Sequence, residues 1–173
     1  NKDAVSMLVS LGIIEGKPDG SYGPTENVDR AQMAKMLSVI MNKGVDNSAL
    51  YQSVNSGLTD ITSHWAKGHI NYCYTTGIIA GRGTGTFDPS ATVTALEAAK
   101  MLLVAVGYDP AIEGFEGADW AINVSVRADE QGIFEGFTKD LSAPLNRDDA
   151  ALLIYNALDV EMIQSYTTNN YPI

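Results

Sequence analysis

Residues 77–106 read GIIAGRGTGTFDPSATVTALEAAKMLLVAV, and this stretch decides the fold because its parts occur again elsewhere in the chain. It combines a glycine motif, Gly77 to Gly81, with a turn-rich loop and a helical pattern. The helical pattern has apolar residues at i, i+3, i+4, i+7 and i+8. This spacing predicts one buried helix face, made of Ala98, Met101, Leu102, Ala105 and Val106.

Both parts of this stretch occur three times. The glycine motif recurs at residues 12–16 and 132–136, and the helical spacing recurs at residues 33–41 and 150–158. From the first copy to the second, both parts shift by 65 positions. From the second copy to the third, the motif shifts by 55 positions and the helix by 52, so the third copy lacks three residues between them. We therefore expect one module used three times.

The offsets divide the chain into five predicted segments. A module of about 50 residues buries too little surface to be comfortably stable alone, so we expect the three copies to share one core. The predicted segments are a first repeat at 1–44, a linker or insertion at 45–57, a second repeat at 58–108, a third repeat at 109–160, and a tail at 161–173 that links to a next domain.

The composition argues against several classes of protein. A net charge of −10 argues against nucleic-acid binding, since backbone phosphates need a basic footprint. Cys73 is the only cysteine, which excludes a disulfide framework, and with two scattered histidines it predicts no zinc site. No run of 18 apolar residues occurs, so we expect no membrane span. No motif calls for a cofactor.

The second helix of every copy is predicted to begin with the same local chemistry. A polar N-cap residue is followed three residues later by an acid or an amide, as in a capping box. The predicted pairs are Asp29 with Gln32, Thr94 with Glu97, and Asn146 with Asp149. In the second copy, we expect Ser63 to cap the first helix and Gly77 to end it.

Two arginines, Arg30 and Arg147, do not fit a purely structural helix start. A cation in the first turn faces the positive end of the helix dipole. Exposed amides together with a guanidinium would make a carboxylate or phosphate site. The alternative is an arginine that covers apolar neighbours or pairs with a nearby acid. Because the two arginines occur at matching positions, we favour the anion site.

Taken together, these motifs resemble the S-layer homology domain over about residues 1–160. The first copy supplies Pro18-Asp19-Gly20-Ser21-Tyr22-Gly23-Pro24. The second supplies Asp60-Ile61, His64-Trp65-Ala66, the glycine motif and Phe87-Asp88-Pro89. The third keeps Trp120-Ala121 at the same distance before its glycine motif as Trp65-Ala66. The Thr-Arg-Ala-Glu helix start of the family corresponds to residues 29–32, 94–97 and 146–149.

The chain also departs from the family pattern. The first copy lacks the Asp and His-Trp-Ala segment, and the third has an altered loop at residues 137–140. The second copy has Ala95 where the family has its arginine, which predicts a weak or inactive pocket there. Arg82 and Lys17, in the neighbouring loops, are the candidates to replace that arginine.

The resemblance implies a mainly α fold, in which three helix-loop-helix prongs surround a central helical bundle with pseudo-threefold symmetry. It implies a non-catalytic, extracellular module that anchors a surface protein to the bacterial cell wall. The implied ligand is an anionic secondary cell-wall polysaccharide with pyruvate ketals, bound between prongs. The arginine would meet the pyruvyl carboxylate, and a tryptophan would cover a sugar face. The candidate ligand-binding residues are Arg30, Arg147, Trp65, Trp120, Asp29, Thr94, Asn146, Gln32, Glu97, Lys17 and Arg82.

The sequence is compatible with alternative functions. The repeats could serve in self-assembly of a surface lattice, with lattice neighbours as partners, or could bind modified peptidoglycan. A calcium-binding loop is disfavoured, because no stretch has acidic residues at alternate positions with a glycine and a distal glutamate. A glycosidase is disfavoured, because no carboxylate lies in a recognisable catalytic motif. His64 is expected to form a hydrogen bond at a helix start rather than to bind a ligand.

Overall fold

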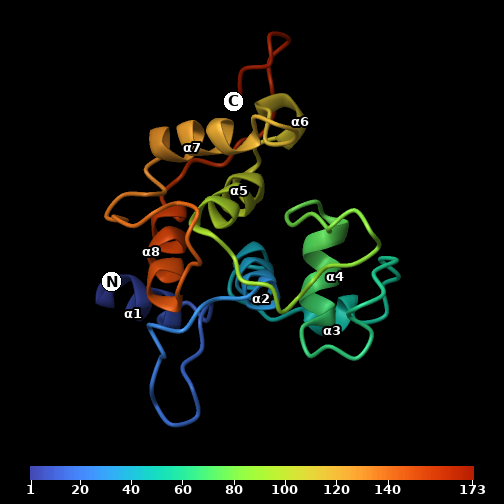
Figure 1. The fold of residues 1–173 in the computed structure, drawn as a ribbon, viewed down its shortest axis with the longest axis vertical. Helices are drawn as coiled ribbons and strands as arrows, with labels where there is room; N and C mark the ends of the chain where they lie inside the picture. The colour runs from blue at the N-terminus through green and yellow to red at the C-terminus, as the bar shows by residue number, and fades with distance from the viewer.

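The computed structural model describes all 173 residues and contains eight α-helices and no strand, so the predicted mainly α class is confirmed (Figure 1). None of the helices is long and apolar enough to cross a membrane. The helices are α1 (Lys2–Ser10), α2 (Arg30–Met41), α3 (Ser48–Tyr51), α4 (Lys67–Thr75), α5 (Ala95–Val106), α6 (Pro110–Glu113), α7 (Trp120–Glu130) and α8 (Arg147–Ala157).

The predicted caps of α2 and α5 are both present as complete capping boxes. The Asp29 side chain accepts from the backbone N–H of Gln32, and the Gln32 side chain accepts from the backbone N–H of Asp29. Thr94 and Glu97 make the same reciprocal pair at α5. At α8 only half of the box forms, because the Asn146 side chain accepts from Asp149 N–H but no bond returns.

The start of α4 differs from the prediction. The helix begins at Lys67, so Ser63 lies too far upstream to cap it and that prediction is wrong. His64 instead orders the turn before the helix, because its Nδ1 accepts from the backbone N–H of Ala66 at 3.0 Å. The expected hydrogen-bonding role of His64 is therefore confirmed. Gly77 follows the helix with φ +80°, a conformation that favours glycine.

The starts of α2, α5 and α8 meet in a closed ring of backbone hydrogen bonds. Val28 N–H donates to Leu145 O at 2.9 Å, Leu145 N–H donates to Val93 O at 2.7 Å, and Val93 N–H donates to Val28 O at 3.1 Å. Each of these residues directly precedes an N-cap and is buried. Three equivalent chain positions therefore satisfy one another, which is what a pseudo-threefold arrangement of the repeats would require.

Each first helix packs against the second helix of a different predicted repeat. Helix α4 contacts α2, α7 contacts α5, and α1 contacts α8, so α1 joins the beginning of the chain to its last helix. Figure 1 shows α1, α4 and α7 on three different sides of the molecule. A single cluster of 37 buried apolar residues connects all these elements, so the predicted repeats share one core.

The predicted linker at residues 45–57 is packed rather than extended. It contains α3, which lies against α4, and the Tyr51 and Tyr72 rings meet edge to face at 4.9 Å between centroids. Asn71, fully buried on α4, donates to the backbone oxygens of Tyr51 and Val54. The insertion thus covers the outer face of α4.

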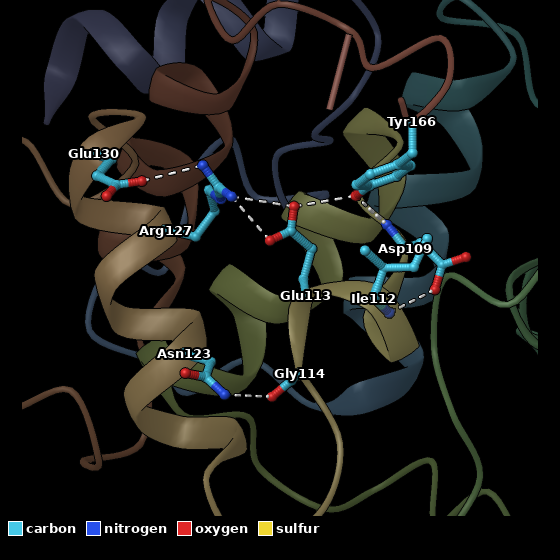
Figure 2. Close-up of polar contacts among 8 residues, drawn as sticks. All are labelled: Asp109, Ile112, Glu113, Gly114, Asn123, Arg127, Glu130 and Tyr166. Carbon is cyan, nitrogen blue, oxygen red and sulfur yellow. Dashed lines mark hydrogen bonds and ion pairs between the residues drawn. The ribbon is translucent and has the colours of Figure 1, made fainter. Parts of the chain in front are cut away.

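The tail after residue 160 also folds back onto the helices. The Tyr166 hydroxyl accepts from Asp109 N–H at 2.8 Å and donates to Glu113 at 3.1 Å (Figure 2). Arg127 on α7 binds the same Glu113 carboxylate through both oxygens, at 2.9 and 3.2 Å, and also contacts Glu130. This network attaches the tail to α6 and α7.

Candidate functional site

Two grooves lie at matching positions of the fold. We call them the Trp65 groove, of about 310 Å³, and the Trp120 groove, of about 350 Å³. Their volumes are in the range of small-ligand sites. The Trp65 groove is lined by Ile13, Ile14, Glu15, Gly16, Lys17, Gln32, Lys35, Met36, Trp65 and Arg147, among others. The corresponding residues of the Trp120 groove are Ile78, Ile79, Ala80, Gly81, Arg82, Glu97, Lys100, Met101, Trp120 and Arg30.

In the Trp120 groove, Arg30 is held by the loop of the second glycine motif. Its Nε donates to Phe87 O at 2.8 Å and its Nη2 to Ala80 O at 2.6 Å. The guanidinium carbon lies 4.6 Å from the centroid of the Phe87 ring. Arg30 is only 4% exposed. Burial, with the nearby Arg82 charge, lowers the pKa of Arg30 to about 10, so the side chain stays charged at neutral pH.

In the Trp65 groove, Arg147 makes the same contacts with the first glycine motif. Its Nε donates to Tyr22 O at 2.8 Å and its Nη2 to Glu15 O at 3.1 Å. The guanidinium carbon lies 4.6 Å from the centroid of the Tyr22 ring. Each arginine therefore joins the start of one helix to the loop of another copy. Its guanidinium also lies against the aromatic ring of that loop.

The Nη1 nitrogens of Arg30 and Arg147 make no hydrogen bond within the protein, and neither is a buried unsatisfied atom. The arginines are therefore neither paired with acids nor free. In each arginine, Nε and Nη2 donate to backbone carbonyls, and these bonds orient the guanidinium. The third nitrogen is a donor that remains available in a residue that lines the groove.

The helix-start amides do not supply further donors, so this part of the prediction is wrong. At α2, the backbone N–H of Arg30 donates to Ala91 O, that of Ala31 to Pro89 O, and that of Gln32 to the Asp29 side chain. The first turn of α8 is satisfied in the same way. An anion in either groove would therefore meet side-chain cations rather than bare amides.

The two tryptophans differ in exposure. Trp65 is 60% exposed and lines its groove, and its ring centroid lies 5.6 Å from that of His64. Trp120, at the start of α7, is half-buried against the core. The ammonium of Lys100 lies 5.7 Å from the centroid of the Trp120 ring. A flat aromatic surface is thus present in each groove.

Sequence reasoning missed a pair of lysines, Lys35 and Lys100. They occupy the same position on α2 and α5, 65 residues apart, and each lines a groove. That offset is the signal that could have found them. Among the predicted cations, Lys17 pairs with Glu26, and Arg82 lies 3.7 Å from Asp88.

Not every predicted site residue reaches a groove. Gln32 and Glu97 line the grooves, whereas Asp29, Thr94 and Asn146 do not, because their side chains are occupied as helix caps. Arg82 lines the groove that already contains Arg30, and Lys17 the groove of Arg147, so neither replaces the arginine missing at Ala95.

The third arrangement of helix start and loop lacks both groove cations. The start of α5 meets the third loop through a bond from Leu96 N–H to Leu141 O, as α2 meets the second loop through Ala31 and Pro89. Ala95 takes the arginine position there, and Leu152 takes the lysine position of α8. An anion placed there would find neither a guanidinium nor an ammonium from these positions.

Comparison with known protein families gives a match in two parts of the chain. Residues 1–34 and 57–99 match the S-layer homology domain. The chain contains S-layer homology (SLH) domains. Both matched stretches contain a glycine motif and the helix start that follows it. The SLH match and the relatives below indicate a location at the bacterial cell surface or cell wall.

Several relatives carry names consistent with that location. A "Cell surface protein" of Thermoanaerobacter kivui is 30% identical over 162 residues, which covers 93% of this chain. The "S-layer protein EA1" of Bacillus anthracis is 32% identical over 111 residues, 64% of this chain. An "Amylopullulanase" of Thermoanaerobacterium thermosulfurigenes is 30% identical over 173 residues, 91% of this chain. The chain spans only 20%, 12% and 9% of the length of these relatives.

Proposed function

We propose that this chain is a non-catalytic anchoring module that binds anionic, pyruvylated cell-wall polysaccharide in the Trp65 and Trp120 grooves. The SLH match and the surface-protein relatives support an anchoring role. One observation carries the choice of ligand: an oriented guanidinium, a lysine and a tryptophan line a groove of ligand size, and this set occurs twice.

The chemistry of a pyruvate ketal suits this set. The ketal places one compact carboxylate on a pyranose ring, and a planar guanidinium recognises a carboxylate with directed hydrogen bonds. The ammonium of Lys35 or Lys100 adds a second positive charge. The apolar C–H face of the sugar would pack on the tryptophan. The overall net charge of −10 does not oppose this binding, because each groove concentrates cations locally.

Two grooves on one chain would strengthen attachment to a repetitive polymer. When one groove is occupied, the second binds a neighbouring sugar of the same polymer at high effective concentration. Attachment can then be firm although each groove binds a single sugar weakly. A strong wall anchor without a covalent bond is therefore compatible with two grooves of this modest volume.

Cosedimentation with purified cell-wall sacculi tests the proposal. We expect binding to intact sacculi, and loss of binding after the wall polymer is stripped or its pyruvate is removed by mild acid. Binding that survives both treatments would contradict the proposal. It would favour peptidoglycan, or assembly between copies, as the basis of attachment.

A pair of variants separates the grooves from general charge. Lys35→Gln with Lys100→Gln removes one cation from each groove and should reduce binding at least about tenfold. Lys2→Gln with Lys43→Gln removes the same charge from exposed positions outside the grooves and should leave binding unchanged. Equal losses in the two variants would indicate nonspecific attraction to an anionic wall.

A further inference from the structure

We infer that the fourth residue of the glycine motif, Glu15 in one groove and Ala80 in the other, sets how tightly each groove binds an anion. Glu15 makes the Trp65 groove the weaker site, and Ala80 leaves the Trp120 groove the stronger one. This inference rests on the proposed function, because it assumes that anionic sugars bind in these grooves.

The contacts of the groove lysines differ at this position. In the Trp65 groove, the ammonium of Lys35 lies 3.1 Å from the Glu15 carboxylate. In the Trp120 groove, Ala80 stands in place of Glu15, and Lys100 has no carboxylate oxygen within 4 Å. Its ammonium instead lies 5.7 Å from the centroid of the Trp120 ring. One lysine is therefore neutralised by the protein, and the other is available to a ligand.

The same motif position also contacts the arginine of its groove. The backbone oxygen of Glu15 accepts from Arg147, and that of Ala80 accepts from Arg30. The backbone therefore fixes this residue beside the guanidinium in both grooves. A side chain added here extends from a point next to the arginine, and the Glu15 carboxylate reaches the lysine.

The two grooves do not differ in the number of charged residues that line them. Each groove is lined by three cations and two carboxylates. In the Trp65 groove, the second carboxylate, Glu26, pairs with Lys17. In the Trp120 groove, Glu97 is occupied by the cap at Thr94, and Glu116 is exposed and within 4 Å of no cation. The difference between the grooves is therefore which cations are already paired.

The pairing has a direct consequence for an anionic ligand. To reach Lys35, a carboxylate must displace Glu15 and then remain close to it. An exposed ion pair is weak, and the added repulsion between two carboxylates is moderate near the surface. Together these effects predict that the Trp65 groove binds an anionic sugar about threefold to tenfold more weakly than the Trp120 groove.

The two tryptophans allow each groove to be followed separately, because the chain has only two and each groove contains one. The probe is a methyl pyranoside that carries a 4,6-pyruvate ketal, titrated against the full chain while the two indole N–H signals are recorded by NMR. Trp65→Phe and Trp120→Phe assign the signals. We expect the Trp120 signal to saturate at about threefold to tenfold lower probe concentration than the Trp65 signal.

Exchanging the motif residues tests the cause. Glu15→Gln should tighten binding at Trp65 about threefold or more and leave Trp120 unchanged, whereas Ala80→Glu should weaken binding at Trp120 by a similar factor. Glu135→Gln, at the same motif position in the third copy, is exposed and removes the same charge as a control, so it should change neither curve. Glu15→Gln should not change the affinity of the Trp65 groove for the neutral methyl ester of the probe.

The outcomes separate this inference from the proposed function. If neither indole signal moves in any variant, the grooves are not the sugar sites and the proposed function fails. If both signals move but Glu15→Gln and Ala80→Glu leave their own grooves unchanged, the inference is wrong while the proposed function stands. A tighter Trp65 groove in the unmodified chain would also overturn it.

Discussion

Arg30 and Arg147 connect the fold to the proposed site. Each donates to two backbone carbonyls in the loop of another copy, and in each Nη1 makes no hydrogen bond within the protein. The two differ in burial, since Arg30 is 4% exposed and Arg147 is half-buried. The same contact therefore contributes more to stability at Arg30, because its removal leaves carbonyls unpaired in a drier environment.

This difference predicts unequal costs of substitution. Arg30→Ala should lower the free energy of unfolding by about 2–4 kcal/mol, because Phe87 O and Ala80 O lose their donor. Arg147→Ala, which unpairs Tyr22 O and Glu15 O nearer to solvent, should cost about 1–2 kcal/mol. Urea denaturation measures both values. Equal costs would show that burial does not set the contribution of this contact. A negligible cost at Arg30 would show that the carbonyl contacts do not stabilise the loops.

His69 predicts a dependence of stability on pH. It is 4% exposed, its Nδ1 lies 2.6 Å from the Ser38 hydroxyl, and burial lowers its pKa although Asp46 partly offsets this. The unfolded chain therefore binds more protons between the lowered pKa and 6.5. Stability should be constant above about pH 6.5 and should fall below it, by at most about 1.4 kcal/mol per pH unit.

Melting temperatures from pH 5 to pH 8 measure this effect. The His64→Gln variant, which keeps the buried histidine, should retain the loss of stability on acidification. His69→Gln should lack it, because the carboxylates with lowered pKa titrate below this range. An acid-sensitive His69→Gln variant would assign the effect to another group.

At the scale of single elements, the helix caps separate structural residues from ligand-binding ones. Thr94 caps α5, and its side chain lines neither groove. Thr94→Ala should therefore reduce the free energy of unfolding by about 1 kcal/mol and leave sugar affinity unchanged. Denaturation and calorimetry on the same variant test both parts. A loss of affinity with unchanged stability would return Thr94 to the ligand site.

The sequence predicts those features of the elements that depend on neighbouring residues. The caps at Asp29 and Thr94 follow from chemistry between positions three residues apart, and the end of α4 before Gly77 follows from the tolerance of glycine for a positive φ, here +80°. The prediction for Ser63 is wrong because the residues around His64 form a turn, so α4 begins only at Lys67. The preference of a single residue for a cap position does not reveal that a turn competes with the helix.

The rest depends on residues that are distant in the chain. The carbonyl acceptor of Arg147 on Tyr22 is 125 positions away, and Tyr166 reaches Glu113 over 53 positions. No periodicity encodes such pairs. The sequence therefore predicts the arginines, tryptophans and loops as candidates, but not that carbonyls hold the guanidinium, nor that the helix-start amides are already satisfied.

At the scale of the whole molecule, the packing of α1 on α8 and the shared core predict cooperative unfolding. The predicted repeats are joined by the Val28, Val93 and Leu145 ring, so we expect none to lose its structure without the others. Leu8 on α1 is fully buried, and Leu8→Ala should cost about 2–5 kcal/mol. Every spectroscopic probe of unfolding, wherever it lies in the molecule, should report this same loss of stability.

Single-tryptophan variants test this cooperativity. Trp65 reports on the segment before α4, and Trp120 reports on α7. In Trp65→Phe and Trp120→Phe, fluorescence should show transitions that each coincide with the loss of helical circular dichroism of the same variant. Adding Leu8→Ala should shift both transitions equally. A shift confined to one tryptophan would show that the repeats unfold as independent units.

Calorimetric titration with the pyruvylated methyl pyranoside tests the central claim most directly. Two grooves with oriented guanidinium groups, and a third arrangement without groove cations, predict two molecules bound per chain. They also predict no binding of the same sugar without its pyruvate. Three bound molecules, or equal binding of the unmodified sugar, would contradict the claim that arginine-centred grooves attach this chain to an anionic wall polymer.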